Sequence, residues 1–158
     1  MKSGDILKLV AAITVSQMAG IIGSFFTIPA IPTWYAGLAK PSFAPPNGVF
    51  APVWTTLFLL MGIAAFLVWR TASKKNEVRT GLILFAVQLL LNLCWSIVFF
   101  GLREPGWALA EITVLCLAVL ATIIAFSKVS RLAAWLMSPY LVWIAFAAYL
   151  NYAIWKLN

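Results

Sequence analysis

The stretch TGLILFAVQLLLNLCWSIVFFGL, residues 80–102, runs for 23 positions without a charged side chain, between Arg79 and Arg103. A helix that crosses the hydrocarbon core of a bilayer needs about 20 mostly apolar residues. The stretch therefore predicts a transmembrane helix. Charge is also absent from four other runs, at residues 9–39, 41–69, 112–127 and 132–155.

These runs predict five membrane spans, the fourth reaching back past Glu111 to Pro105. Only 9% of the 158 residues are charged and 64% are hydrophobic, whereas about a quarter of a soluble chain is charged. The sequence predicts an all-α membrane protein, a five-helix transmembrane bundle that forms a single domain over residues 1–158. A long ordered loop at 29–48 joins the first two helices. The expected spans are 6–28, 49–70, 79–101, 105–127 and 133–156.

The net charge of +7 is explained by topology. With five spans, the N-terminus and the loops at 71–78 and 128–132 lie on one side of the membrane. That side carries Lys2, Lys8, Arg70, Lys74, Lys75, Arg79, Lys128 and Arg131, and the other carries Lys40, Arg103 and Lys156. Basic residues gather on the cytoplasmic side, so we expect a cytoplasmic N-terminus. The C-terminus and the 29–48 loop would lie opposite, with a lipid bilayer rather than a nucleic acid as the partner.

The chain contains no histidine, which removes the commonest general base and metal ligand. Cys94 and Cys116 lie in different predicted spans, without the spacing of a metal site or disulfide framework, and are expected to be reduced packing residues. No metal and no required cofactor is predicted. A bundle with an aromatic, amide-bearing interior suits the binding of a large, flat, mostly apolar molecule.

The third span places Gln88, Asn92 and Ser96 on one helix face, because they are four residues apart and Trp95 stands beside them. Two interpretations stay open. The polar groups are either hydrogen-bonding contacts between helices or part of a ligand-binding wall.

The fifth span has a similar face, with a small residue between large ones: Tyr140, Trp143, Ala147, Leu150 and Asn151. A small residue beside aromatic rings leaves room for a ligand. Leu150, Tyr152 and Lys156 also fit a proposed sterol-contact pattern, which is a weak signal. The alternative there is an aromatic belt at the membrane surface with a lysine that reaches the headgroups.

Two further features favour structural roles. Ser16, Gly20 and Ser24 form a stripe of small residues that lets another helix approach closely; contact with a ligand is the alternative. Glu111 lies inside the fourth span, where a carboxylate is a functional candidate, although pairing with a neighbouring helix or reaching the interface is the simpler interpretation.

The predicted loop contains TWYAGLAKPSFAPPNGVF at residues 33–50. Pro41, Pro45 and Pro46 each fix a backbone dihedral, which lowers the entropy cost of ordering the loop. Its aromatic residues give it apolar surface to bury. We expect a semi-rigid lid over the mouth of the bundle; a membrane-surface anchor is the alternative.

Several segments strongly resemble the translocator protein family, also called TspO/MBR or tryptophan-rich sensory proteins. They are WYAGLAKPSFAPP (34–46), PVW (52–54), NLCWSIVFFG (92–101), GWALAE (106–111) and SPYLVWIAFAAYLNYAIWK (138–156). The resemblance implies a five-helix bundle, often a homodimer, that binds porphyrins and, in some members, cholesterol. Its members occur in bacterial envelopes and mitochondrial outer membranes, and the sequence does not choose between these.

By position, the resemblance implies a ligand pocket between the helices, on the side covered by the first loop. Its wall would comprise Tyr35, Pro41, Phe43, Trp54, Asn92, Trp95, Trp143, Ala147 and Leu150. Three positions depart from the family pattern. Phe43 stands where relatives commonly have tryptophan, Ala148 replaces a frequent threonine, and Ser96-Ile97 replaces a frequent proline, which predicts a straighter third helix.

Three functions follow from these observations. The first is non-enzymatic binding of a porphyrin, with a sterol-like lipid as a further candidate ligand, for sensing, sequestration or transport. The second, attributed to some relatives, is light- or oxygen-dependent porphyrin breakdown, in which Trp54 and Trp143 would supply electrons. The third is a structural partner protein whose aromatic interior only fills space.

Overall fold

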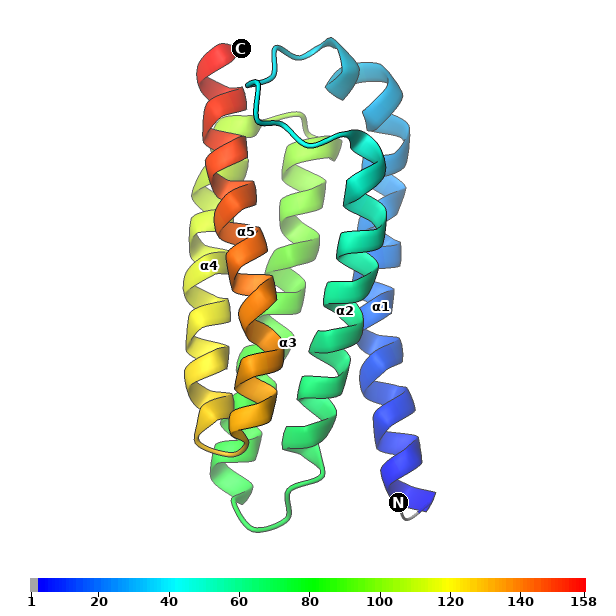
Figure 1. Cartoon of the computed structure of the whole chain (residues 1–158), viewed down its shortest axis with the longest axis vertical. Helices are drawn as coiled ribbons and strands as arrows, with labels where there is room; N and C mark the ends of the chain where they lie inside the picture. The colour runs from blue at the N-terminus through cyan, green and yellow to red at the C-terminus, as the bar shows by residue number, and fades with distance from the viewer. Residues whose placement is uncertain (1–2) are drawn as a thin grey trace.

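The computed structural model describes residues 3–158 and is an up-and-down bundle of helices (Figure 1). All five long helical segments are long and apolar enough to cross a membrane, which confirms the predicted fold class. Lys2, counted above among the basic residues, lies outside the described residues. The elements in order are α1 (Ser3–Ala30), η1 (Ile31–Tyr35), α2 (Asn47–Trp69), α3 (Lys75–Ser96), η2 (Ile97–Gly101), α4 (Pro105–Ser127) and α5 (Arg131–Leu157).

Figure 1 shows the N-terminal end of α1 at the same end of the bundle as the α2–α3 and α4–α5 connections. The C-terminus, the connection from α1 to α2 and the α3–α4 turn lie at the other end. α1 packs on α2 and α3, and α5 packs on α4 and α2. Large apolar side chains such as Trp107 and Trp135, each 74% exposed, point outward, as they do on surfaces that face lipid rather than water.

Glycines let α1 and α2 approach closely. A Cβ added to Gly62 would lie 2.7 Å from the Ile13 Cα, and one added to Gly20 would lie 2.5 Å from the Phe58 ring. Gly20 therefore packs closely against α2, as the stripe of small residues predicts. Ser16 is fully buried, with its hydroxyl donating to the Ala12 carbonyl at 2.9 Å.

The first helix continues beyond the predicted end at residue 28. It passes through Pro29 and ends in the π-helical segment η1, which contains Pro32. A proline inside a helix removes a hydrogen bond and crowds the preceding turn, and wider π turns often occur at such irregularities. Burial of Ala30 and Tyr35, 5% and 4% exposed, favours continuing the helix. The connection to α2 is therefore shorter than the predicted 29–48 loop.

The third helix also differs from its expectation. No proline follows Trp95, yet the helix widens directly after Ser96 into the π-helical segment η2. The wide turn brings two consecutive rings, Phe99 and Phe100, to 5.5 and 6.5 Å from the Trp34 ring. Aromatic packing against η1 thus accounts for a widened turn that the absence of a proline had made unexpected.

The connection between η1 and α2 is held to the C-terminal end of the chain. The Ala39 N–H donates to Asn158 Oδ1, and Asn158 Nδ2 donates to the Ala39 carbonyl, both at 3.0 Å. Phe43 stacks on Tyr149 of α5 with ring centres 5.1 Å apart. These contacts confirm an ordered loop.

Candidate ligand-binding cavity

An inner cavity of about 40 Å³ lies between η1, α2, α3 and α5. Its volume leaves room for only a few water molecules. Aromatic and aliphatic side chains dominate its wall: Thr27, Ile31, Tyr35, Phe50, Trp54, Trp95, Phe99, Phe100, Trp143, Ala147, Leu150, Asn151 and Ile154.

A larger cleft of about 340 Å³ adjoins it between α1, α2 and the end of α3. Six residues line both spaces: Thr27, Ile31, Phe50, Trp54, Trp95 and Phe100. The cleft adds small and polar groups, including Gly20, Gly23, Ser24, Asn92 and Ser96. The side chains that line both spaces form a wall shared by the cleft and the inner cavity.

The amides of α3 and α5 hold the wall together. Asn92, 4% exposed, donates through Nδ2 to the Tyr140 hydroxyl at 3.0 Å. The Trp95 indole N–H donates to Asn151 Oδ1 at 3.2 Å, and Asn151 Nδ2 donates to the Pro105 carbonyl at 2.7 Å. Asn151 therefore links α3, the first residue of α4 and α5, and it fixes the plane of the Trp95 ring.

The tryptophans of the wall are oriented by other rings. Trp54 stacks on Phe58 with centroids 5.6 Å apart and meets Tyr140 edge-on at 6.1 Å. Trp143 contacts Phe50 edge-on at 6.1 Å. The Trp143 indole N–H is buried without a hydrogen-bond acceptor among the described residues, so a ligand oxygen or nitrogen beside it would gain a donor.

The structure brings together seven of the nine side chains assigned to the wall by resemblance: Tyr35, Trp54, Asn92, Trp95, Trp143, Ala147 and Leu150. Pro41 and Phe43 are not among the lining residues. Phe43 instead lies against Tyr149 and Phe146 and is 41% exposed. The loop lies at one end of the bundle (Figure 1), and its Phe43 ring packs on α5 rather than on the cavity.

The stripe on α3 divides among three neighbours. Gln88 Nε2 lies 3.9 Å from the Met61 sulfur of α2, Asn92 reaches Tyr140 of α5, and the Ser96 hydroxyl lies opposite Gly23 of α1. Gln88 fits the helix-contact interpretation, whereas Asn92 both joins two helices and lines the cleft.

Sequence reasoning missed several lining residues. Phe50 stands four positions before Trp54, and that spacing on one helix face was the signal that would have found it. Ile31 belongs to the part of the chain that was expected to be loop. Thr27 lies near the end of the expected first span, where no pattern singled it out. Gly23 carries no chemical signal of its own.

The proposed sterol-contact residues do not share one surface. Leu150 is buried and lines the inner cavity, whereas Tyr152 and Lys156 are exposed. The Lys156 ammonium lies 4.7 Å from the Trp155 ring centre, an arrangement typical of interfacial anchors.

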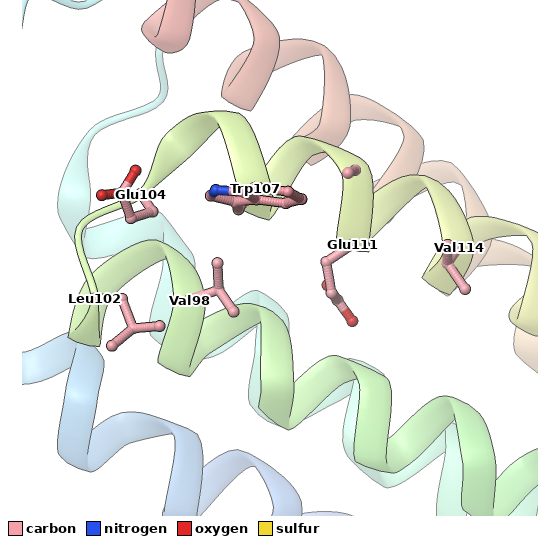
Figure 2. Close-up of a pocket in the computed structure, with 7 residues that line it drawn as sticks. Val98, Leu102, Glu104, Trp107, Glu111 and Val114 are labelled. Carbon is pink, nitrogen blue, oxygen red and sulfur yellow. The ribbon is translucent and has the colours of Figure 1, made fainter.

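Glu111 lies outside the candidate site. It lines a groove of about 450 Å³ on the outer side of the α3–α4 contact, together with Glu104 and Trp107. Figure 2 shows its side chain directed from α4 towards α3. Both carboxylate oxygens are buried without a hydrogen-bond partner among the described residues, so the structure gives Glu111 no role in the cavity.

The cysteines form no disulfide. Cys94 is exposed on the outer face of α3 and Cys116 is half-buried in α4. Cys116 packs against the core, as expected, whereas Cys94 is exposed and contributes little packing.

A bundle of five membrane-spanning helices around an aromatic cavity defines a multi-pass integral membrane protein with an internal candidate ligand site. The chain belongs to the TspO/MBR family, which matches it over residues 12–156. The family resemblance of the sequence is thereby confirmed.

Relatives from distant organisms support this membership. The tryptophan-rich protein TspO of Chlorobaculum tepidum is 46% identical over 154 residues, covering 98% of each chain. The human translocator protein is 44% identical, covering 87% of this chain and 82% of its own. The tryptophan-rich sensory protein of Cereibacter sphaeroides is 39% identical, covering 79% and 77%. These names describe translocator or sensory proteins, not enzymes.

Proposed function

We propose that the protein binds a porphyrin, without enzymatic turnover, in the space formed by the inner cavity and the adjoining cleft. Binding would serve sensing, sequestration or transport of the tetrapyrrole. The names of the relatives, translocator and sensory protein, favour these roles over catalysis. No cofactor is required for them.

The observation that carries the proposal is the shared wall of Phe50, Trp54, Trp95 and Phe100. Pockets that hold drug-sized ligands measure about 300–1,000 Å³, so the cleft of about 340 Å³ is at the small end of that range. Rotation of the shared rings would join it to the inner cavity. A flat macrocycle could then stack on the displaced tryptophans.

Polar groups would orient the macrocycle within this space. The unpaired N–H of Trp143 and the amide of Asn92 offer hydrogen bonds, while the propionates of a porphyrin are acceptors. The apolar share of the wall also suits a sterol-like lipid as a competing ligand.

Titration of the purified protein with protoporphyrin IX, followed through the Soret absorbance band, tests the proposal. An aromatic contact contributes about 0.5–1.5 kcal/mol, so Trp54→Ala should weaken binding roughly two- to tenfold. Trp135→Ala, which removes a lipid-facing ring, is the matched control and should leave the dissociation constant unchanged. Equal affinities of all three proteins would contradict the proposal.

A second candidate function is light- or oxygen-dependent breakdown of the bound porphyrin. The observation that favours it is that Trp54 and Trp143 line the same cavity, where their indoles could reduce a photoexcited ring. Under illumination, the wild-type protein would then bleach porphyrin faster than a Trp54→Phe/Trp143→Phe variant. Equal bleaching rates at equal occupancy would remove this candidate.

We also propose that the N-terminal end of α1 faces the cytoplasm and that two chains form a homodimer. Seven described basic residues support the orientation: Lys8, Arg70, Lys74, Lys75, Arg79, Lys128 and Arg131 lie at that end. A Ser130→Cys protein labelled in intact cells by a membrane-impermeant maleimide would contradict the orientation. A monomeric mass in light scattering would contradict the dimer.

A further inference from the structure

A groove of about 590 Å³ lies outside the bundle, where α2 ends and α3 begins. Trp69 and Thr71 form one side of it. On α3, Lys75 and Arg79 line the groove nearest the start of the helix, and Leu82 and Ile83 line it further along. It shares no lining residue with the aromatic cavity.

The chemistry of the groove changes along α3. Lys75 and Arg79 are four residues apart and therefore share a helix face, which continues through Leu82 and Ala86. Ala86 stands 11 positions after Lys75, which corresponds to a rise of roughly 16 Å along the helix. Over that distance the groove passes from two exposed cations to side chains that face the hydrocarbon, where Ile83 is 52% exposed.

No acidic side chain is among the described residues that line the groove. Glu77 stands two positions from both Lys75 and Arg79 on α3, and it is not among the residues that line the groove. A third cation, the Lys8 ammonium of α1, lies 5.9 Å from the Trp69 ring centre. Trp69 itself is partly exposed, as tryptophans at the headgroup level of a membrane are.

We propose that this groove binds one anionic phospholipid. The guanidinium of Arg79 and the ammonium of Lys75 contact the headgroup phosphate, since arginine matches phosphate with two parallel hydrogen bonds. The first part of an acyl chain lies along Leu82, Ile83 and Ala86.

A lipid can occupy the whole groove, whereas a soluble anion can occupy only the part beside Lys75 and Arg79. Basic pockets beside membrane helices bind anionic headgroups in this way. The groove opens at the same end of the bundle as most of the basic side chains, so it lies where one leaflet presents its headgroups.

Native mass spectrometry of the detergent-purified protein, titrated with phosphatidylglycerol, tests the proposal. Each basic residue near a membrane surface strengthens binding several-fold, so Lys75→Gln/Arg79→Gln should weaken phosphatidylglycerol binding on the order of tenfold. Lys128→Gln/Arg131→Gln is the matched control, because it removes the same charge at the same end without touching the groove. It should change the affinity less than twofold. Phosphatidylcholine with the same acyl chains should bind all three proteins weakly.

Equal losses in the two double variants would overturn the proposal, because the general charge of that end would then explain binding. An unchanged affinity of the Lys75→Gln/Arg79→Gln protein would overturn it as well. Inorganic phosphate, added at the concentration at which phosphatidylglycerol half-saturates the protein, should not displace the lipid; displacement would exclude a contribution from the acyl chain. All four substituted residues are exposed, and equal thermal unfolding midpoints would verify that the variants fold alike.

Discussion

The hydrogen bond between Trp95 and Asn151 permits a quantitative test of how the cavity wall is held. Its length is 3.2 Å, and it joins α3 to α5 beside the inner cavity. Asn151→Leu removes the acceptor with little change of shape, and Trp95→Phe removes the donor. The two single variants and the double variant form a thermodynamic cycle.

The expected coupling energy between Trp95 and Asn151 follows from the position of their hydrogen bond between two membrane-spanning helices. Hydrogen bonds between transmembrane helices contribute about 0.6 kcal/mol on average and up to about 1.7 kcal/mol. Asn151→Leu also loses the 2.7 Å bond to the Pro105 carbonyl, but this loss is present with and without Trp95 and cancels in the cycle. We therefore expect a coupling of about 0.6–1.7 kcal/mol.

Reversible unfolding with sodium dodecyl sulfate in mixed micelles supplies the four free energies. The matched control pairs Asn151→Leu with Trp135→Phe. Trp135 faces lipid about four turns away on the same helix, so the two changes in unfolding free energy should add to within about 0.5 kcal/mol. A Trp95–Asn151 coupling no larger than that of the control would refute this account of the wall. The freed Trp95 ring should also weaken porphyrin binding of the Asn151→Leu protein roughly three- to tenfold, which corresponds to about 0.6–1.4 kcal/mol.

Three further predictions concern packing and the loop. Gly62→Ala places a methyl group 2.7 Å from the Ile13 Cα, so it should destabilise the protein by about 1–3 kcal/mol; an unchanged thermal midpoint would argue against that close approach. Asn158→Ala removes both hydrogen bonds to Ala39, and faster amide exchange in residues 36–46 is expected, with wild-type rates as the contrary result. Phe43→Ala removes the stacking on Tyr149 and should raise the porphyrin off-rate several-fold if the loop is a lid; the same off-rate would make the loop a mere connector.

The membrane fold could be predicted from the sequence because charge-free runs long enough to cross a bilayer have no stable environment other than the membrane. The ends of the helices were harder to predict. Pro29 and Pro32 are local signals for a break, and burial of Tyr35 against Phe99 and Phe100 outweighs them. A contact between residues more than 60 positions apart cannot be inferred from local sequence.

The candidate site was predictable where helical periodicity applies. Trp143, Ala147 and Leu150 were placed on one face by spacing, and all three line the inner cavity. Phe43 lies in an irregular segment, where no periodicity says which way a ring points. On α1, the spacing that predicts a stripe of small residues includes Gly20 and Ser24, and both line the cleft. Gly23 was missed because it matters through the side chain that it lacks.

A porphyrin bound inside the bundle would lie against the wall shared by the cavity and the cleft. The most direct measurement is the anomalous scattering position of zinc in crystals grown with zinc protoporphyrin IX. We expect a zinc peak between α1, α2 and α3, with the macrocycle in contact with Trp54 and Trp95. A peak on the outer surface beside Tyr152 and Lys156, with the cavity unchanged, would contradict it.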